Sequence, residues 1–404
     1  NTLEEQVRLV KKVKRHENIL IDHPYTVKKN NTIKEIRSYA KKVGLDGFLV
    51  VDDENVLQGI CSARDYAFIQ DETILVQDVM TPREKLIVSS KSLTIVEAEE
   101  TFHQYKIEKL PVVDENGKLL GLMTSKDCKR SKTHPWSAKD KKGRLLVGAA
   151  IGVKSDFLER STALVDAGCD VLVVDIAHGH SIHAIEVIQK LKQHFPLAGI
   201  IAGNVATPEG TEDLIKAGAD AIKVGVGPGS MCSTRIVTGS GVPQFTAVLE
   251  CAKAAAQYRI PIIADGGIKE SGDIVKALAA GASTVMIGGL LAGTEESTGV
   301  FITKNNMKFK LYRGMASVGA ALSKLRVDNQ TEADLNEITP EGVEKLVPFK
   351  GSARDIIKKL VGGLLSGISY SGGTSIKELQ ENAEFIKITG AGWEESIPHG
   401  QKED

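Results

Sequence analysis

The sequence has almost no net charge and no apolar run long enough to cross a bilayer. A transmembrane helix needs about eighteen consecutive apolar residues, and none occurs in the chain shown. Lys and Arg number 51 against 52 Asp and Glu, which leaves a formal charge of -1. Because no overall field draws the protein to nucleic acid or anionic lipid, we expect neither as a partner. An anionic ligand must therefore be held by local groups.

Cysteine motifs are also missing. The five cysteines form no CxxC pair and show no metal-ligand spacing with the nine histidines. This pattern excludes a disulfide framework or a zinc site of the usual spacing, and it is typical of a reducing compartment, so we expect a cytoplasmic protein. The chain opens at Asn1 without a methionine, which leaves an upstream targeting segment open.

An internal repeat is the first feature that is present. Val51-Asp52, Gly59 and Asp65 recur at one constant offset as Val113-Asp114, Gly121 and Asp127. Each copy is predicted to form a strand, an acidic turn, a second strand and the start of a helix, with an amphipathic helix in front.

The repeat resembles a tandem pair of CBS modules spanning residues 19–130. That resemblance implies a regulatory domain that binds an adenine or guanine nucleotide, with Asp65 and Asp127 as candidate ribose ligands. A structural repeat without a ligand is the alternative.

Beyond a Pro- and Lys-rich connector, apolar runs alternate with helical patterns and end in Gly, Asp or Asn. The runs are 147–152, 171–179, 198–205, 221–229, 261–267 and 284–289. Continuous hydrophobic strands between helices indicate a parallel sheet covered on both faces. We predict an α/β fold of the (β/α)8 TIM barrel type, and a doubly wound sheet is the competing architecture.

The six runs are two short of a closed barrel. We therefore expect two upstream strands to be missing from this chain, and residues 1–18 to form a barrel helix without its strand. On this interpretation residues 131–404 complete the barrel, including a mobile flap at about 316–347, and the 19–130 repeat is inserted into it.

The segment 224–244 carries the clearest chemical signal. Glycines at 225, 227 and 229 free backbone N–H groups to face an anion, and Ser230 adds a hydroxyl, so a phosphate is the predicted occupant. Cys232 follows, with Arg235 close behind. A lone cysteine is more often buried filler, but a thiol in a glycine-lined loop near an arginine can act as a nucleophile.

The pattern GxGPGSxCxTR in this segment is similar to the active-site loop of the IMP dehydrogenase/GMP reductase family, and the similarity extends over the whole chain. The resemblance implies a purine mononucleotide as substrate and covalent catalysis by Cys232. The substrate-binding residues that it implies are Ser230, Asp265, Gly267, Gly288, Gly289, Tyr312, Gly314, Met315 and Glu341.

The same resemblance implies a cofactor and a cation. Asp175 and Gly225 match the positions that contact NAD. Gly227, Gly229 and Cys232 match the backbone positions that hold a monovalent cation in the family's dehydrogenases, together with Glu395 and Ser396 of a neighbouring subunit, and potassium is the cation that we expect. A homotetramer or larger homo-oligomer follows from a shared cation site.

Two reactions of the family fit the residues. A dehydrogenase oxidises IMP with NAD, whereas a reductase converts GMP to IMP with NADPH and uses Thr234 and Glu296 to release ammonia. The segments AGTEES at 292–297 and ITGAGWEESIPH near the end favour the dehydrogenase, as does the two-copy insert. The flap favours the reductase, because the dehydrogenases' water-activating Arg-Tyr pair reads here as Arg326 and Val327. A catalytically weak nucleotide sensor is a third possibility, against which the intact Cys232 argues.

Overall fold

The computed structural model describes residues 2–15, 20–45, 47–91, 93–133, 136–141, 143–327 and 339–398. It divides into two compact units: unit 1 comprises Asn1–Gln6, Gly148–Asp166 and Asp170–Asp404, and unit 2 comprises Val7–Val147 and Ala167–Cys169. Helix α1 (Leu3–Arg15) contributes to both. In the described residues, no helix combines the length and apolar composition that crossing a membrane requires.

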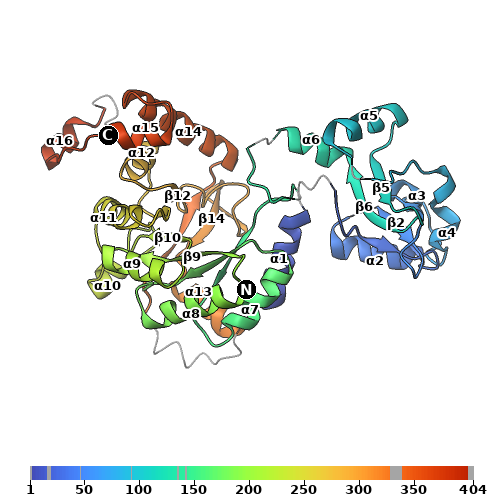
Figure 1. Ribbon diagram of the computed structural model, residues 1–404, viewed down its shortest axis with the longest axis horizontal. Coiled ribbons are helices and arrows are strands. Elements are labelled where there is room, and N and C mark those ends of the chain that lie inside the picture. The colour runs from blue at the N-terminus through green and yellow to red at the C-terminus, as the bar shows by residue number, and fades with distance from the viewer. Residues whose placement is uncertain are drawn as a thin grey trace. The chain divides into compact units, whose positions relative to one another are not determined.

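Unit 2 is built from two copies of one pattern, a helix followed by a β-hairpin and a second helix (Figure 1). The first copy consists of α2 (Ile33–Val43), β2 (Phe48–Val51), β3 (Leu57–Cys61) and α3 (Ala63–Tyr66). The second consists of α5 (Ile95–Tyr105), β5 (Lys109–Val113), β6 (Leu119–Thr124) and α6 (Ser125–Thr133). The shorter elements are β1 (Thr26–Val27), α4 (Val76–Val79), β4 (Thr81–Pro82) and a 3-10 turn, η1 (Arg83–Lys85).

The two hairpins have the same register, which confirms the internal repeat. Val51 pairs with Leu57 in the first copy, and Val113 pairs with Leu119 in the second. The register also shifts one residue before each of these pairs, at corresponding steps of the two hairpins. A shared irregularity of this kind shows that the sequence recurrence reflects one folded pattern used twice.

The helices of the two copies also begin alike. Thr32 and Glu35 form a reciprocal capping box at the start of α2, and Thr94 and Glu97 form one at the start of α5. Their ends differ in residue type. α2 ends at Gly44 with a φ of 70°, whereas α5 ends at Lys106, a non-glycine residue in the same left-handed region with a φ of 54°.

Unit 1 contains a six-stranded parallel sheet whose strands follow one another in chain order, β12-β11-β10-β9-β8-β7. The strands are β7 (Gly148–Ile151), β8 (Val171–Asp175), β9 (Gly199–Val205), β10 (Ala221–Val224), β11 (Ile262–Asp265) and β12 (Thr284–Met286). The helices between them are α7 (Phe157–Asp166), α8 (Ile182–His194), α9 (Pro208–Lys216), α10 (Thr234–Thr238), α11 (Gln244–Ala256) and α12 (Ser271–Ala279). Figure 1 shows α8, α9 and α11 around the strands.

The sequential strand order is that of a (β/α) barrel and differs from a doubly wound sheet, in which the order reverses at a switch point. Within the described residues the sheet is open, with β7 and β12 at its edges. Three of the helix-to-strand turns contain glycines with positive φ, Gly168, Gly218 and Gly281, whose φ values are 98°, 111° and 103°. The carboxyl ends of the parallel strands therefore lie along one edge of the sheet, where a ligand site is expected.

The chain beyond β12 adds a small antiparallel sheet and several helices to unit 1. The sheet contains β13 (Phe301–Lys304), β14 (Met307–Arg313) and β15 (Glu344–Pro348). The helices are α13 (Val318–Val327), α14 (Ala353–Tyr370), α15 (Ile376–Asn382) and α16 (Gly390–Glu395). Because β14 ends just before the predicted flap and β15 contains the last residues of the flap, their pairing holds the two ends of the flap together.

Candidate active site

The loop after β10 depends on glycine for its shape. Gly225 and Gly227 have φ values of 150° and 80°, which side-chain-bearing residues rarely adopt. A Cβ on Gly225 would collide with the backbone oxygen of Asp265 at the end of β11. Arg235 donates hydrogen bonds to the carbonyls of Val226 and Val242 at 3.1 Å and 2.5 Å. The arginine that the sequence placed beside the thiol therefore braces the loop backbone.

Cys232 is exposed, whereas the other four cysteines are buried. Burial raises the pKa of the Cys61 and Cys251 thiols from 9.0 to about 11, so these two are poor nucleophiles. The Cys232 thiol donates to the hydroxyl of Thr234 at 3.1 Å, and that hydroxyl donates to Oε2 of Glu341 at 2.7 Å. A proton on the thiol is thus two hydrogen bonds from a carboxylate.

The C-terminal part of the predicted flap is joined to the Cys232 loop through the backbone. Ser233 donates its N–H to the carbonyl of Glu341 at 2.8 Å, and Val343 donates to the carbonyl of Met231 at 2.9 Å. Gly314 also donates to Val343, at 3.0 Å, so the end of β14 joins the same group. Glu341 therefore reaches the thiol because its own backbone is fixed against the loop.

A compact group of small and hydroxyl-bearing residues lies beside this loop. The Ser230 hydroxyl is 3.4 Å from the Tyr312 hydroxyl. A Cβ on Gly289 would be 2.6 Å from Ser230 Oγ, and one on Gly288 would be 3.2 Å from Tyr312 OH. Side chains at the two glycines would fill this space, so the structure brings four of the predicted substrate-binding residues together.

Sequence reasoning missed Lys350, whose ammonium donates to the carbonyls of Gly289 and Leu290 at 3.3 Å. This places a cation at the carbonyl side of the turn that contains Gly288 and Gly289, two of the predicted substrate-binding residues. The lysine follows β15, far along the chain from the turn, so no local pattern points to it.

Two strands of the sheet end in a carboxylate: β8 ends at Asp175 and β11 ends at Asp265. Between them is the buried ammonium of Lys223, 2.9 Å from Asp175 Oδ1 and 2.5 Å from Asp265 Oδ2. Asn204 donates to Asp265 Oδ2 at 2.9 Å and accepts from Lys223. Sequence reasoning named both aspartates but neither Lys223 nor Asn204. The available signal was a lysine inside the otherwise apolar run of β10.

Several predicted residues lie elsewhere in unit 1. Glu296 accepts hydrogen bonds from Ala353 N at 2.8 Å and from Ser352 Oγ at 2.9 Å at the start of α14, and these bonds lower its pKa. The hydrogen-bond partner of Thr234 in the structure is Glu341, and a joint role of Thr234 and Glu296 in releasing ammonia stays a prediction.

The remaining predicted residues are placed as follows. Met315 is exposed, and Gly267 has a φ of 81° and packs beside Gln244. Glu395 and Ser396 are at the end of α16, where the Ser396 hydroxyl donates to the carbonyl of Gly392. Arg326 is in α13, but its side chain and residues 328–338 of the flap lie outside the described part of the chain.

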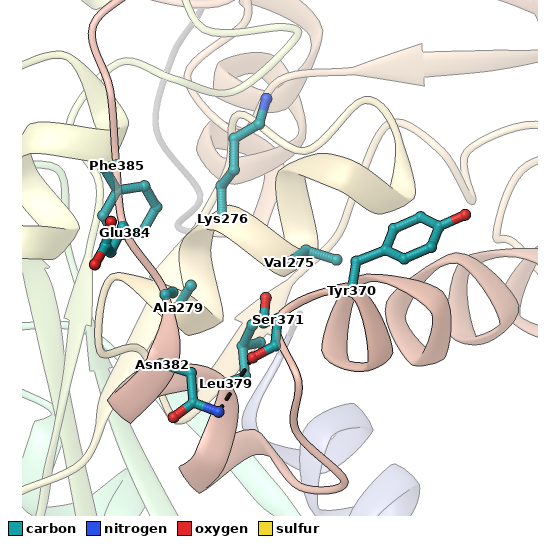
Figure 2. Close-up of a pocket in the computed structure, with 10 residues that line it drawn as sticks. Val275, Lys276, Ala279, Tyr370, Ser371, Leu379, Asn382, Glu384 and Phe385 are labelled. Carbon is teal, nitrogen blue, oxygen red and sulfur yellow. Dashed lines mark hydrogen bonds between the residues drawn. The ribbon is translucent and has the colours of Figure 1, made fainter.

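Figure 2 shows a hollow between α12, α14 and α15 in which none of the predicted site residues is found. Two of its lining residues are bonded to each other, since Asn382 Nδ2 donates a 3.1 Å hydrogen bond to the carbonyl of Ser371. Its lining is part apolar and part polar, with Lys276 and Glu384 as its charged groups. It has no nucleophile paired with a base, so the chemistry is assigned to the Cys232 loop.

The chain matches the family model described as IMP dehydrogenase / GMP reductase domain over residues 1–399. It is 50% identical over 401 residues to an inosine-5'-monophosphate dehydrogenase of Nitrosopumilus maritimus, covering 98% of this chain and 84% of the relative. It is 46% identical over 409 residues to a GMP reductase of Leishmania donovani, covering 98% and 83%. The solved GMP reductase of Trypanosoma brucei in complex with guanosine 5'-monophosphate gives a TM-score of 0.91 at 43% identity, covering 99% of this chain and 84% of that one.

Proposed function

Because the chain belongs to the IMP dehydrogenase/GMP reductase family, whose members are oxidoreductases, we propose that it oxidises IMP to xanthosine monophosphate with NAD. The observation that carries the proposal is the exposed Cys232 thiol in hydrogen-bonded series with Thr234 and Glu341. A purine C–H bond is a poor hydride donor until a nucleophile has added to its carbon, and this series supplies a nucleophile with a route for its proton.

The substrate fits beside the thiol through three sets of contacts. The phosphate is held by Ser230, Gly288, Gly289 and Tyr312. The short distances among these four residues support this assignment. Asp265 accepts the ribose hydroxyls, since a carboxylate at a strand end can bind two vicinal hydroxyls. Gly267, Gly314 and Met315 adjoin these groups, and Glu341 approaches the purine edge.

The reaction has two stages. The sulfur of Cys232 adds to C2 of the purine after its proton passes through Thr234 toward Glu341, and the hydrogen at C2 then leaves as a hydride. Water next adds to the same carbon, and the C–S bond breaks to return the thiol and release xanthosine monophosphate. Arg326 on the flap and Glu341, which is bonded to Thr234, are the two candidate bases for the water.

The cofactor side is assigned to Asp175 and Gly225. Asp175 fits a ribose, because its carboxylate is partly exposed at the end of β8 and only Oδ1 is bonded to Lys223. When bound, NAD supplies the acceptor for the hydride. The backbone carbonyls of Gly227, Gly229 and Cys232, with Glu395 and Ser396 of a neighbouring copy, are proposed to hold potassium in a homotetramer or larger assembly, since carbonyl oxygens suit such a cation.

GMP reductase is the second candidate. A GMP reductase matches the same 98% of this chain as the dehydrogenases do, so the two-copy insert does not distinguish the reactions. A reductase would use NADPH, and Thr234 with Glu341 could protonate the departing ammonia. The deciding experiment is an absorbance assay that offers IMP with NAD and, separately, GMP with NADPH. Turnover of only the second pair would replace the dehydrogenase by the reductase.

We also propose that unit 2 is a CBS pair that binds a purine nucleotide and regulates the enzyme. Asp65 and Asp127 are at corresponding helix starts, where each accepts through Oδ2 from its capping residue, Ser62 or Thr124. Oδ1 of Asp65 can face a ribose, whereas Oδ1 of the buried Asp127 is 3.9 Å from the guanidinium of Arg130. Calorimetry with ATP, ADP, GTP and GDP tests this role. Asp65→Asn and Asp127→Asn should each weaken the binding, whereas absence of heat with all four nucleotides would leave a structural role.

A further inference from the structure

Lys223 makes an ion cluster that crosses four neighbouring strands of the sheet. Its side chain is 4% exposed, against 41% for Asp175 and 24% for Asp265. Its ammonium bonds Asp175 at the end of β8, Asn204 in β9 and Asp265 at the end of β11. A lysine ammonium has three N–H donors, and these three acceptors use all of them.

The cluster contains one positive charge and two negative charges. A buried ammonium is strongly destabilising unless it is paired, so its position is set by the two carboxylates. The carboxylates in turn depend on it, because each gives one oxygen to Lys223. Within the described residues, Asp175 Oδ2 and Asp265 Oδ1 take no hydrogen bond from the protein. Each aspartate thus presents one oxygen to a ligand while the other is anchored.

We propose that Lys223 is a positioning residue that aims both ribose-binding carboxylates and links substrate binding to cofactor binding. The inference rests on the proposed function for its assignment of Asp265 to the substrate and Asp175 to the cofactor. A change in the charge or position of one carboxylate alters the bonds of the shared ammonium, and so alters the other carboxylate. Neither ligand needs to touch Lys223 for this to occur.

The first test compares Lys223→Met with the wild type. Methionine keeps most of the apolar stem and removes the charge. Losing a charge-assisted hydrogen bond at each carboxylate should raise KM for IMP and KM for NAD by about tenfold or more each, with a smaller fall in kcat. Lys223→Arg should restore part of both KM values, because it keeps the charge.

Lys192→Met is the matched control, since Lys192 forms an ion pair with Asp220 at 2.8 Å on the surface of unit 1. It should leave both KM values unchanged. A purely structural role for Lys223 would lower the melting temperature and kcat at unchanged KM, and that result would overturn the proposal. A wild type that turns over neither nucleotide pair would instead overturn the proposed function.

The second test measures the link itself and needs no turnover. Calorimetry gives the affinity for IMP alone in the wild type, Asp175→Asn, Lys223→Met and the double variant. If Lys223 links the two carboxylates, the fold-change caused by Asp175→Asn should differ by about threefold or more when Lys223→Met is also present. Equal fold-changes in both backgrounds would mean that Asp175 acts on IMP only through long-range charge, and the link would be disproved.

Discussion

The hydroxyl of Thr234 donates a 2.7 Å hydrogen bond to Glu341, a residue 107 positions further along the chain. Thr234 is the first residue of α10, directly after the nucleophile loop, and Glu341 is in the C-terminal part of the predicted flap. The backbone bond from Ser233 to the carbonyl of Glu341 fixes the same approach. The proposed proton route therefore depends on a contact between two segments that are far apart in the sequence.

Glu341→Gln should lower steady-state turnover about a hundredfold, because general base catalysis contributes at least this much in many enzymes. Glutamine keeps the size of the side chain and the acceptor for Thr234 but is not a base. Stopped-flow absorbance with IMP and NAD measures the effect. Glu250→Gln, at a surface ion pair with Lys253, is the control and should turn over like the wild type. Unchanged turnover in Glu341→Gln would remove this carboxylate from the mechanism.

Arg326→Ala distinguishes the two candidate bases. The flap has Val327 where the family's dehydrogenases have a tyrosine, and valine cannot donate or accept a hydrogen bond. An arginine normally has a pKa above about 12, so it needs help to act as a base. We expect a burst of NADH followed by slow turnover in the wild type, and a further slowing of the second phase in Arg326→Ala. A second phase of unaltered rate would assign the water step to Glu341.

Cys232→Ala should abolish turnover, because no covalent bond to the purine can form. Binding of IMP should survive, since the phosphate and ribose contacts belong to other residues. Calorimetry and a melting curve on the same sample separate loss of chemistry from loss of fold. Appreciable turnover in a folded Cys232→Ala protein would disprove the covalent mechanism.

The buried thiol of Cys251 predicts a pH effect on stability. Its folded pKa is raised from 9.0 to about 11 by burial, so it binds a proton more tightly in the folded chain. The stabilisation that this protonated thiol adds to the free energy of unfolding is therefore fully present below pH 9 and is lost as pH rises toward 11. The fall in melting temperature between pH 8 and pH 11 should be smaller in Cys251→Ala than in the wild type. An equal fall in both would show that this thiol does not contribute.

The sequence was most informative where the signal is local. Glycines at 225, 227 and 229 predicted a loop whose backbone faces a ligand, and the structure gives Gly225 and Gly227 a positive φ. The repeat in unit 2 was visible because valine, glycine and aspartate recur at fixed positions, and their hairpins have equal registers. The parallel sheet followed from apolar runs between helices.

Long-range partners could not be found in this way. Lys223 joins residues 48 and 42 positions away, and nothing beside it in the sequence indicates which carboxylates it bonds. The bond of Thr234 to Glu341, rather than to Glu296, was missed for the same reason. Both glutamates follow the nucleophile loop, and only the folded path of the chain places Glu341 against Thr234 and Glu296 at the start of α14.

Because the two copies in unit 2 have matching hairpins, their sequences can be compared position by position within this one chain. At the end of the first helix, one copy has Gly44 and the other has Lys106 in the same left-handed conformation. A side chain there costs about 1 kcal/mol, and a Cβ on Gly44 would meet nothing within 4 Å, so the cost is in the backbone itself. Lys106→Gly should therefore raise the free energy of unfolding by up to about 1 kcal/mol in denaturant titrations. A less stable variant would show that the lysine contributes more than its conformation costs. The residue found in one copy thus indicates a substitution to test for stability at the matching position of the other copy.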